Sequence, residues 1–259
     1  AGSGTITING RGEGIGHGIE FGYYGANLTP TLRSSSNATT AISINGTATN
    51  GSASYTGYQG SVVAIANGTG GISLSGTGAC GSYAALTGTL NLYAASGDIA
   101  VNGYGGMGLN IGGNLGKGNL SASSSNVTFT ADKISYSTTT INTTGNVSIL
   151  SNSSAFASAV SLTNLVLNTT VAVFTVGKTT NNQDLTISSA INIAGPISIY
   201  GGAITINAAL TATGSTITLK GTGAVTDGTN GYVVASNLLL LGGSVTLDNG
   251  ANNAIDTLA

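Results

Sequence analysis

Short triplets of apolar, polar and apolar residues recur along most of this chain, with small residues between them. The segment from Gly195 to Gly228 contains three, ISI, ITI and ITL, within GPISIYGGAITINAALTATGSTITLKGTGAVTDG. Because strand side chains alternate between two faces, each triplet turns two apolar side chains one way and one polar side chain the other. The triplets are too short to be helices. A repeated strand geometry is therefore the strongest constraint on the fold.

The triplets return at a nearly constant spacing of about 19 residues, which is the mark of a repeat architecture. Aligned by their first apolar residue, they begin at Ile72, Leu90, Leu109, Val127, Val147, Leu165, Leu185, Ile204, Val225 and Val245. Two further series run through Ile197, Ile217 and Leu238, and through Val171, Ile191, Leu210 and Tyr232. Three short strands joined by tight turns account for a period of about 20 residues. The chain is predicted to coil, so that each strand pairs in parallel with its equivalent one turn later.

The predicted fold is therefore all-β, a right-handed parallel β-helix with about three short strands per turn of about 20 residues. The composition favours it, because 41% apolar residues, 42 glycines and only two prolines suit pleated strands and tight turns. Residues 72–259 are expected to form a regular β-solenoid shaft. Residues 1–71 are expected to form less regular, Gly- and Tyr-rich turns continuous with it.

Charge and apolar patterning exclude several classes of partner. Six basic and eight acidic residues lie scattered along the chain, so no basic surface for nucleic acid is expected. No apolar run approaches the roughly 20 residues of a membrane span. Cys80 is the only cysteine, which rules out a disulfide within the chain and fits a secreted protein. The AGSGT start lacks the basic and apolar regions of a signal peptide, so we expect a processed or excised piece.

Several segments resemble the repetitive shaft of filamentous-haemagglutinin-like bacterial exoproteins, which are large adhesins exported by two-partner secretion. They are GDIAVNG from Gly97, GNVSILS from Gly145 and the repeats that follow Gly195. The resemblance implies a right-handed β-helix at the outer cell surface that supports attachment, aggregation or biofilm formation. It also implies a glycan or protein of a host or neighbouring cell as partner. The family's secretion domain carries NPNL and NPNG motifs, and neither occurs here. The chain is thus expected to be an interior shaft segment.

Parallel β-helices also include polysaccharide lyases and hydrolases, which use clustered acidic residues on one outer wall. Asp227 and Asp248 are 21 residues apart and could stack on adjacent turns as paired carboxylates for acid–base chemistry or calcium. Each follows a strand and precedes Gly or Asn-Gly, however, which favours a role in a turn. The interpretation as turn residues is preferred.

RGEGIGHGIE, from Arg11 to Glu20, combines His17 with two acids and an arginine. Such a group could bind a metal or transfer a proton. In one extended strand, however, the glycines at 12, 14, 16 and 18 would form a bare face. A bare face permits close approach of another backbone, and this packing interpretation is preferred over a site.

Tyrosines that lie on an outer wall could stack on sugar rings, although tyrosines that cover corners are commoner. The candidates are Tyr23, Tyr24, Tyr55 and Tyr58.

Asparagine glycosylation is a further hypothesis, in a chain so rich in Asn, Ser and Thr that many sequons arise by chance. The candidate acceptors are Asn27, Asn37, Asn67, Asn126, Asn146 and Asn168.

These observations favour a structural shaft that holds binding elements away from a cell surface, with no catalysis and no cofactor expected. Two alternatives stay open. One is a β-helix that binds or cleaves carbohydrate, which requires acids and aromatic residues together on one wall. The other is a filament subunit that associates end to end or side to side through exposed strand edges.

Overall fold

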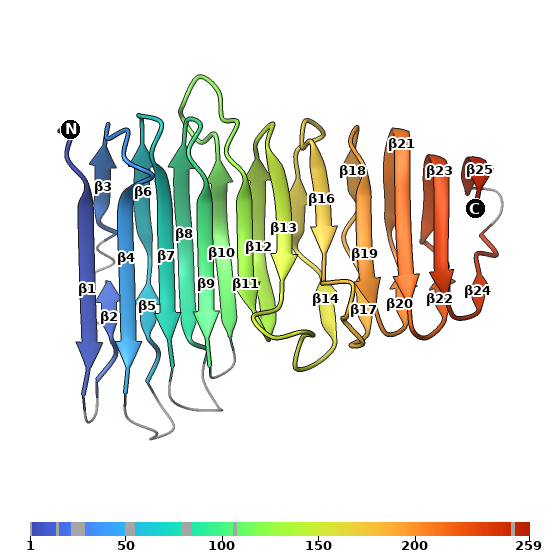
Figure 1. The fold of residues 1–259 in the computed structure, drawn as a ribbon, viewed down its shortest axis with the longest axis horizontal. Helices are drawn as coiled ribbons and strands as arrows, with labels where there is room; N and C mark the ends of the chain where they lie inside the picture. The colour runs from blue at the N-terminus through green and yellow to red at the C-terminus, as the bar shows by residue number, and fades with distance from the viewer. Residues whose placement is uncertain are drawn as a thin grey trace.

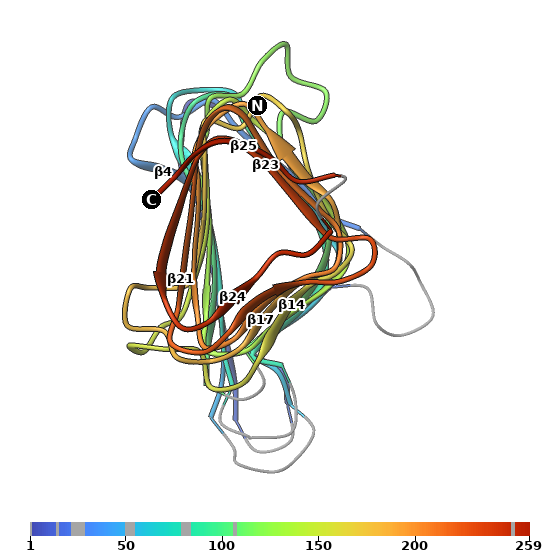
Figure 2. The same cartoon turned by 90° about the vertical axis from the view of Figure 1, so that its right-hand side faces the viewer.

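The computed structural model describes residues 2–13, 16–21, 29–49, 55–78, 84–105, 108–249 and 252–259. These residues form 25 strands and no helix, so none of the described segments is a helix able to cross a bilayer. Every strand pairing among them is parallel. The strands stack in chain order from one end of the molecule to the other (Figure 1), and the view along the stack has a three-sided outline (Figure 2). The fold is all-β and solenoid-like.

The strands belong to three sheets, each running along the stack. The 12-stranded sheet contains β1 (Ile6–Gly12), β4 (Thr40–Ala48), β7 (Gly71–Thr77), β9 (Ile99–Tyr104), β11 (Val127–Ala131), β13 (Asn146–Leu150), β16 (Val173–Val176), β18 (Ile191–Ile193), β19 (Ile197–Gly201), β21 (Ala209–Gly221), β23 (Tyr232–Gly242) and β25 (Ala254–Leu258). The 8-stranded sheet contains β2 (Ile19–Phe21), β3 (Thr31–Ser34), β5 (Tyr58–Gly60), β6 (Val62–Ala66), β8 (Leu86–Ala94), β10 (Leu109–Gly116), β12 (Ile134–Asn142) and β15 (Leu165–Leu167). The 5-stranded sheet contains β14 (Val160–Leu162), β17 (Leu185–Ile187), β20 (Ile204–Ile206), β22 (Val225–Asp227) and β24 (Val245–Thr246).

Apolar side chains at equivalent positions of successive strands form the core. In the 12-stranded sheet one such ladder runs through Ile6, Ile42, Ile72, Ile99, Val127, Val147, Phe174, Ile197, Ile217, Leu238 and Leu258. From Ile42 to Leu238 its members are at most 1% exposed. The outer residues of the triplets therefore point inward and the middle residues outward, as the alternation predicts.

The single series of triplets drawn from the sequence mixes strands of different sheets, and that part of the prediction is wrong. Ile72 pairs with Ile99, whereas Leu90 lies in the 8-stranded sheet opposite Val62. Val147 pairs with Phe174, and Leu165 lies in the 8-stranded sheet. Triplets on different walls have the same pattern, so their spacing alone does not identify their partners. The stacking of Val127 on Val147, and of Leu185, Ile204, Val225 and Val245 on one another, is confirmed.

The number of residues between stacked positions is larger in the first turns than in the last ones. Asn45 stacks on Asn9, 36 residues earlier, and Ser75 on Asn45, 30 residues earlier. Asn237 stacks on Thr216 only 21 residues earlier. The predicted period of about 20 residues thus holds for the last turns and is too short for the first ones. The 5-stranded sheet begins only at β14, so the first turns contain strands of the other two sheets.

A ladder of glycines lies where the 12-stranded sheet comes close to the backbone of the facing segment. Gly10, Gly46, Gly76 and Gly103 are paired in register in the 12-stranded sheet. A Cβ atom on Gly46 would collide with the carbonyl oxygen of Gly57 in the facing segment. Only glycine permits two backbones to lie this close.

Candidate functional site

The carboxylate of Asp227 binds backbone and side-chain donors of the next turn. Its Oδ1 accepts the N–H of Asp248 at 2.9 Å, and its Oδ2 accepts the N–H of Asn249 at 3.3 Å and Nδ2 of Asn253 at 3.0 Å. Burial alone would raise the pKa of Asp227, but these hydrogen bonds outweigh it and the pKa is lowered. Asp227 is the last residue of β22, and its carboxylate links two successive turns.

Two other acids make the same kind of contact. Asp132 accepts the N–H of Ser153 at 2.8 Å and its hydroxyl at 2.7 Å. Asp184 accepts the N–H of Ala203 at 2.7 Å. These carboxylates occupy the corners and satisfy donors that no strand partner reaches. Among the described residues, no three His, Cys, Asp or Glu side chains come together as metal ligands.

The Arg11 to Glu20 segment forms two strands rather than one, because β1 ends at Gly12 and β2 begins at Ile19. Nδ1 of His17 lies 3.0 Å from Oγ1 of Thr56 and accepts the N–H of Thr56 at 3.0 Å. The His17 ring also packs edge to face on Tyr55, with ring centroids 5.4 Å apart. Arg11 pairs with Glu13 at 3.0 Å on the surface. His17 therefore packs against a neighbouring turn.

The glycines of this segment support the packing interpretation. A Cβ atom on Gly12 would collide with the backbone of Gly16 and His17, and one on Gly18 with the backbone of Thr47 and Gly57. The prediction that these glycines form one bare face of a single strand is wrong, because the segment contributes to two separate strands, β1 and β2. Close backbone approach is confirmed at Gly12 and Gly18.

The candidate tyrosines differ in position. Tyr58 is 0% exposed and its ring packs edge to face on Phe21, so the expectation that it contacts a glycan is wrong. Its side chain points inward from β5 and therefore serves the core. Tyr55 is half-buried against His17. Tyr23 and Tyr24, together with Cys80, lie outside the described residues.

The candidate glycosylation sites also differ. Asn37, Asn67 and Asn146 are exposed, and Asn27 lies outside the described residues. Nδ2 of Asn126 donates to Asp98 at 2.9 Å, and Nδ2 of Asn168 donates to Asn142 at 3.0 Å. A glycan on Asn126 or Asn168 would replace part of these turn-to-turn contacts. Asn67 and Asn146 are the more accessible acceptors, because Oδ1 of Asn37 accepts the N–H of Thr69 at 3.0 Å.

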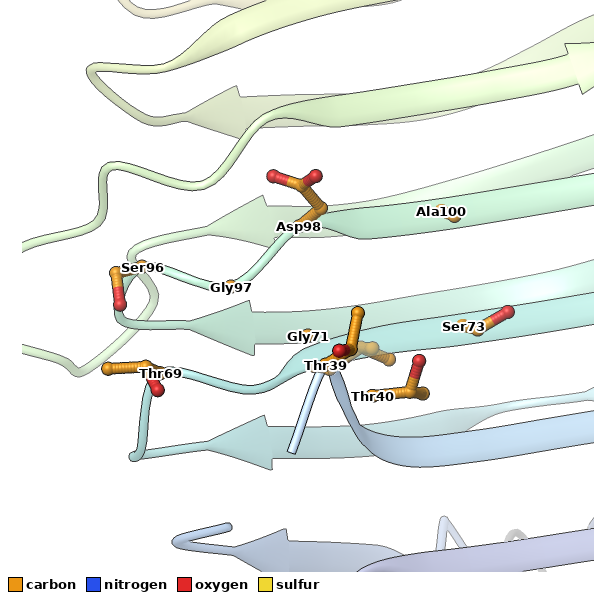
Figure 3. Close-up of a pocket in the computed structure, with 10 residues that line it drawn as sticks. Thr39, Thr40, Thr69, Gly71, Ser73, Ser96, Gly97, Asp98 and Ala100 are labelled. Atoms are coloured by element: carbon orange, nitrogen blue, oxygen red, sulfur yellow. The ribbon is translucent and has the colours of Figure 1, made fainter. Parts of the chain in front are cut away.

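A groove of about 440 Å³ crosses the outer wall where β4, β7 and β9 begin. Its polar lining consists mainly of hydroxyl groups, including those of Thr39, Thr69 and Ser96 (Figure 3). The carboxylate of Asp98 points away from Thr39 in this view and is bonded to Asn126. The groove can hydrogen-bond a polyhydroxylated ligand. It has neither a basic residue nor an aromatic ring in its lining.

A second pocket of about 240 Å³ lies on the other side of the same corner, over the ends of β3, β6 and β8. Its lining is chemically mixed and comprises Arg33, Ile65, Asn67, Tyr93, Asn119 and Leu120. We call this site the Arg33–Tyr93 pocket. Arg33, Ile65 and Tyr93 are register partners on three successive strands, and Asn119 and Leu120 belong to the loop after β10.

Sequence reasoning missed this pocket, although part of its signal is present. Arg33 lies in TLRS and Tyr93 in LNLYA. Each occupies an outward position in a strand whose inward positions are more buried. Arg33 pairs with Ile65, 32 residues later, and Ile65 pairs with Tyr93, 28 residues later, and the assumed period of about 20 residues does not match these spacings. Of the candidate residues named from sequence, only Asn67 belongs to it.

Comparisons with known proteins return no match: no family model, no curated protein and no solved structure matches this chain.

Proposed function

We propose that this chain is an interior segment of the shaft of a secreted or surface-anchored bacterial adhesin. In this proposal the chain winds as a right-handed parallel β-helix, with three short strands per turn in its last turns. The shaft holds binding elements away from the outer cell surface and supports attachment, aggregation or biofilm formation. Its partner is a glycan or protein on a host or neighbouring cell.

The observation that carries the proposal is the continuous register from β1 to β25. Each strand of the 12-stranded sheet pairs with the next turn, and one apolar cluster extends from Ile19 to Leu238. Interactions of this kind join only neighbouring turns, so such a fold gains length without a change in its cross-section. At about 4.8 Å per strand, the 12-stranded sheet gives a rod about 50 Å long.

The hydrogen bonds of the acidic residues favour a structural role of these residues over a catalytic one. Asp132, Asp184 and Asp227 each accept a backbone N–H from the following turn. A general acid or nucleophile needs a free carboxylate directed at the substrate. These three carboxylates are engaged in joining turns.

The proposal is tested first by shape. Small-angle X-ray scattering and electron microscopy of the purified chain should show unbranched rods about 50 Å long that resist trypsin in the native state. Polymers of such rods would favour the filament alternative. Compact globular particles would overturn the shaft proposal.

Adhesion is tested separately. Beads coated with the folded chain should bind to host or neighbouring cells more than beads coated with the heat-unfolded chain. Equal binding of both bead types would contradict the adhesive part. Release of reducing ends from any polysaccharide offered would contradict the proposal that the chain is not an enzyme.

Carbohydrate binding is a second candidate function, compatible with the first. The Arg33–Tyr93 pocket favours it, because an aromatic ring, a guanidinium and two amides line one cavity there. No carboxylate lines this pocket, which argues against cleavage at this site.

A further inference from the structure

We propose that the Arg33–Tyr93 pocket binds a carboxylated sugar, that is, a uronic acid unit of an acidic polysaccharide. The inference rests on the proposed adhesive function, because it names the partner that the shaft would contact. It is argued from the pocket's size, the free guanidinium of Arg33, the apolar surface beside it and the two amides.

Arg33 provides the anion-binding group. It points outward from β3 and is exposed, and within the described part of the chain its guanidinium has no ion pair or hydrogen bond. No Asp or Glu lines the pocket. A guanidinium presents paired N–H donors that match the two oxygens of a carboxylate. Arg33 is thus available to a ligand carboxylate.

Tyr93 provides the surface for the carbon face of a sugar ring, and the nearly buried Ile65 lies beside it in the pocket lining. Ile65 faces outward from β6, yet it is only 7% exposed, because it lies between Arg33 and Tyr93 in the ladder and under the loop after β10. Outward positions elsewhere on these strands are mainly small or polar. An aromatic ring beside an aliphatic side chain is the surface on which the C–H groups of a sugar pack.

The position of the Tyr93 ring is fixed from two sides. Its hydroxyl donates to Oδ1 of Asn91 at 3.3 Å. Gly118 lies against the ring, where a Cβ atom would collide with the ring carbons. Burial raises the pKa of the Tyr93 phenol. A fixed aromatic ring loses little conformational entropy when a ligand binds.

Asn67 and Asn119 complete the pocket. Each side-chain amide offers both donors and an acceptor, which suits sugar hydroxyls. Arg33 and Tyr93 lie two strands apart, a backbone separation of about 10 Å. With a volume of about 240 Å³, the pocket accommodates one ring with its carboxyl group rather than a long chain.

The experiment uses the full chain and a trigalacturonate probe, with binding measured by calorimetry or ligand-observed NMR. The control ligand is the same trisaccharide with its carboxyls methyl-esterified, which keeps the hydroxyls and removes the charge. Arg33→Gln should weaken binding about tenfold or more, whereas Arg11→Gln, the same charge change at a distant surface position, should not. Tyr93→Leu should weaken binding, while Tyr93→Phe keeps the ring and should bind nearly as the wild type. Circular dichroism should show that all variants fold.

The inference would be supported if the ester binds about tenfold more weakly than the acid and if Arg33→Gln loses affinity for the acid. Equal binding of acid and ester, unchanged binding in Arg33→Gln, or no binding of the acid would overturn it. Displacement of the probe by equimolar sulfate would identify a general anion site and would also overturn it. If the probe does not bind but coated beads still adhere to cells, this pocket is excluded while the adhesive function stands.

Discussion

Oδ1 of Asp227 accepts the backbone N–H of Asp248 at 2.9 Å, which joins two successive corners of the 5-stranded sheet. Oδ2 of the same carboxylate binds Asn249 and Asn253. One side chain thereby holds three donors of the following turn. The acid contributes to folding as a link between turns.

Asp227→Asn should therefore destabilise the last turns and remove part of the pH dependence of stability. Because the folded-state pKa of Asp227 is lowered, its contribution is complete above the unfolded pKa of about 3.9 and is lost as pH falls through the folded-state value. We expect a cost on the order of 1 kcal/mol at pH 7, since these hydrogen bonds are partly exposed. Denaturant unfolding of both proteins at pH 7 and at pH 2.5 tests this. A difference between them that does not shrink in acid would refute the assignment.

Phe174→Ala should cost roughly 3–5 kcal/mol of unfolding free energy. Phe174 is 0% exposed in the core ladder between Val147 and Ile197, so its removal leaves a cavity shared by three turns. Thr175→Ala, one residue along and facing outward, should change stability by less than about 0.5 kcal/mol. Guanidinium titrations of the two variants provide the comparison. Similar costs would mean that the inward and outward assignments of β16 are reversed.

Tyr136→Phe should leave the protein equally stable or raise stability by about 1 kcal/mol. The side chain is 5% exposed, and its hydroxyl is buried with no hydrogen-bond partner among the described residues. Phenylalanine keeps the edge-to-face contact with Phe129, whose ring centroid is 5.8 Å away. Thermal unfolding measures the change, with Tyr136→Leu as the variant that loses the ring. A marked loss of stability in Tyr136→Phe would indicate a buried water bound to the hydroxyl.

Gly46→Ala should cost about 2 kcal/mol or more, because the new methyl group would collide with the carbonyl of Gly57. Gly4→Ala is the matched control, since a Cβ atom there has nothing within 4 Å. Melting temperatures of the two variants should separate clearly. If the two melt together, the 12-stranded and 8-stranded sheets are further apart at this corner than described.

The sequence predicts the kind of fold better than the identity of stacked residues. Alternation within a triplet is a local property, so the inward positions of Val127, Val147 and Ile204 follow from it directly. Which triplet stacks on which depends on the length of every loop between them. Ile72 stacks on Ile99 and not on Leu90, because the strand that contains Leu90 lies in another sheet of the same turn.

The candidate sites are likewise predictable from the sequence only where they depend on neighbouring residues. The position of Asp227 at the end of a strand and before a glycine follows from its neighbours. Tyr58 could not be placed from its neighbours, because it lies in a glycine-rich segment without a clear alternation. The Arg33–Tyr93 pocket joins residues 60 positions apart on three turns, a relation visible only when the register is known.

The parallel pairing described above has a mechanical consequence. The hydrogen bonds between turns run along the length of the rod. A force that pulls its two ends apart therefore stretches these bonds, and the interfaces between turns carry it in series. The ladder between β12 and β15 has only three paired positions, whereas that between β21 and β23 has ten. Under load the turns around β15 should separate before those joined by β21 and β23. A rod of this kind that joins two surfaces would then lengthen in steps, and each step would dissipate mechanical energy before the attachment breaks.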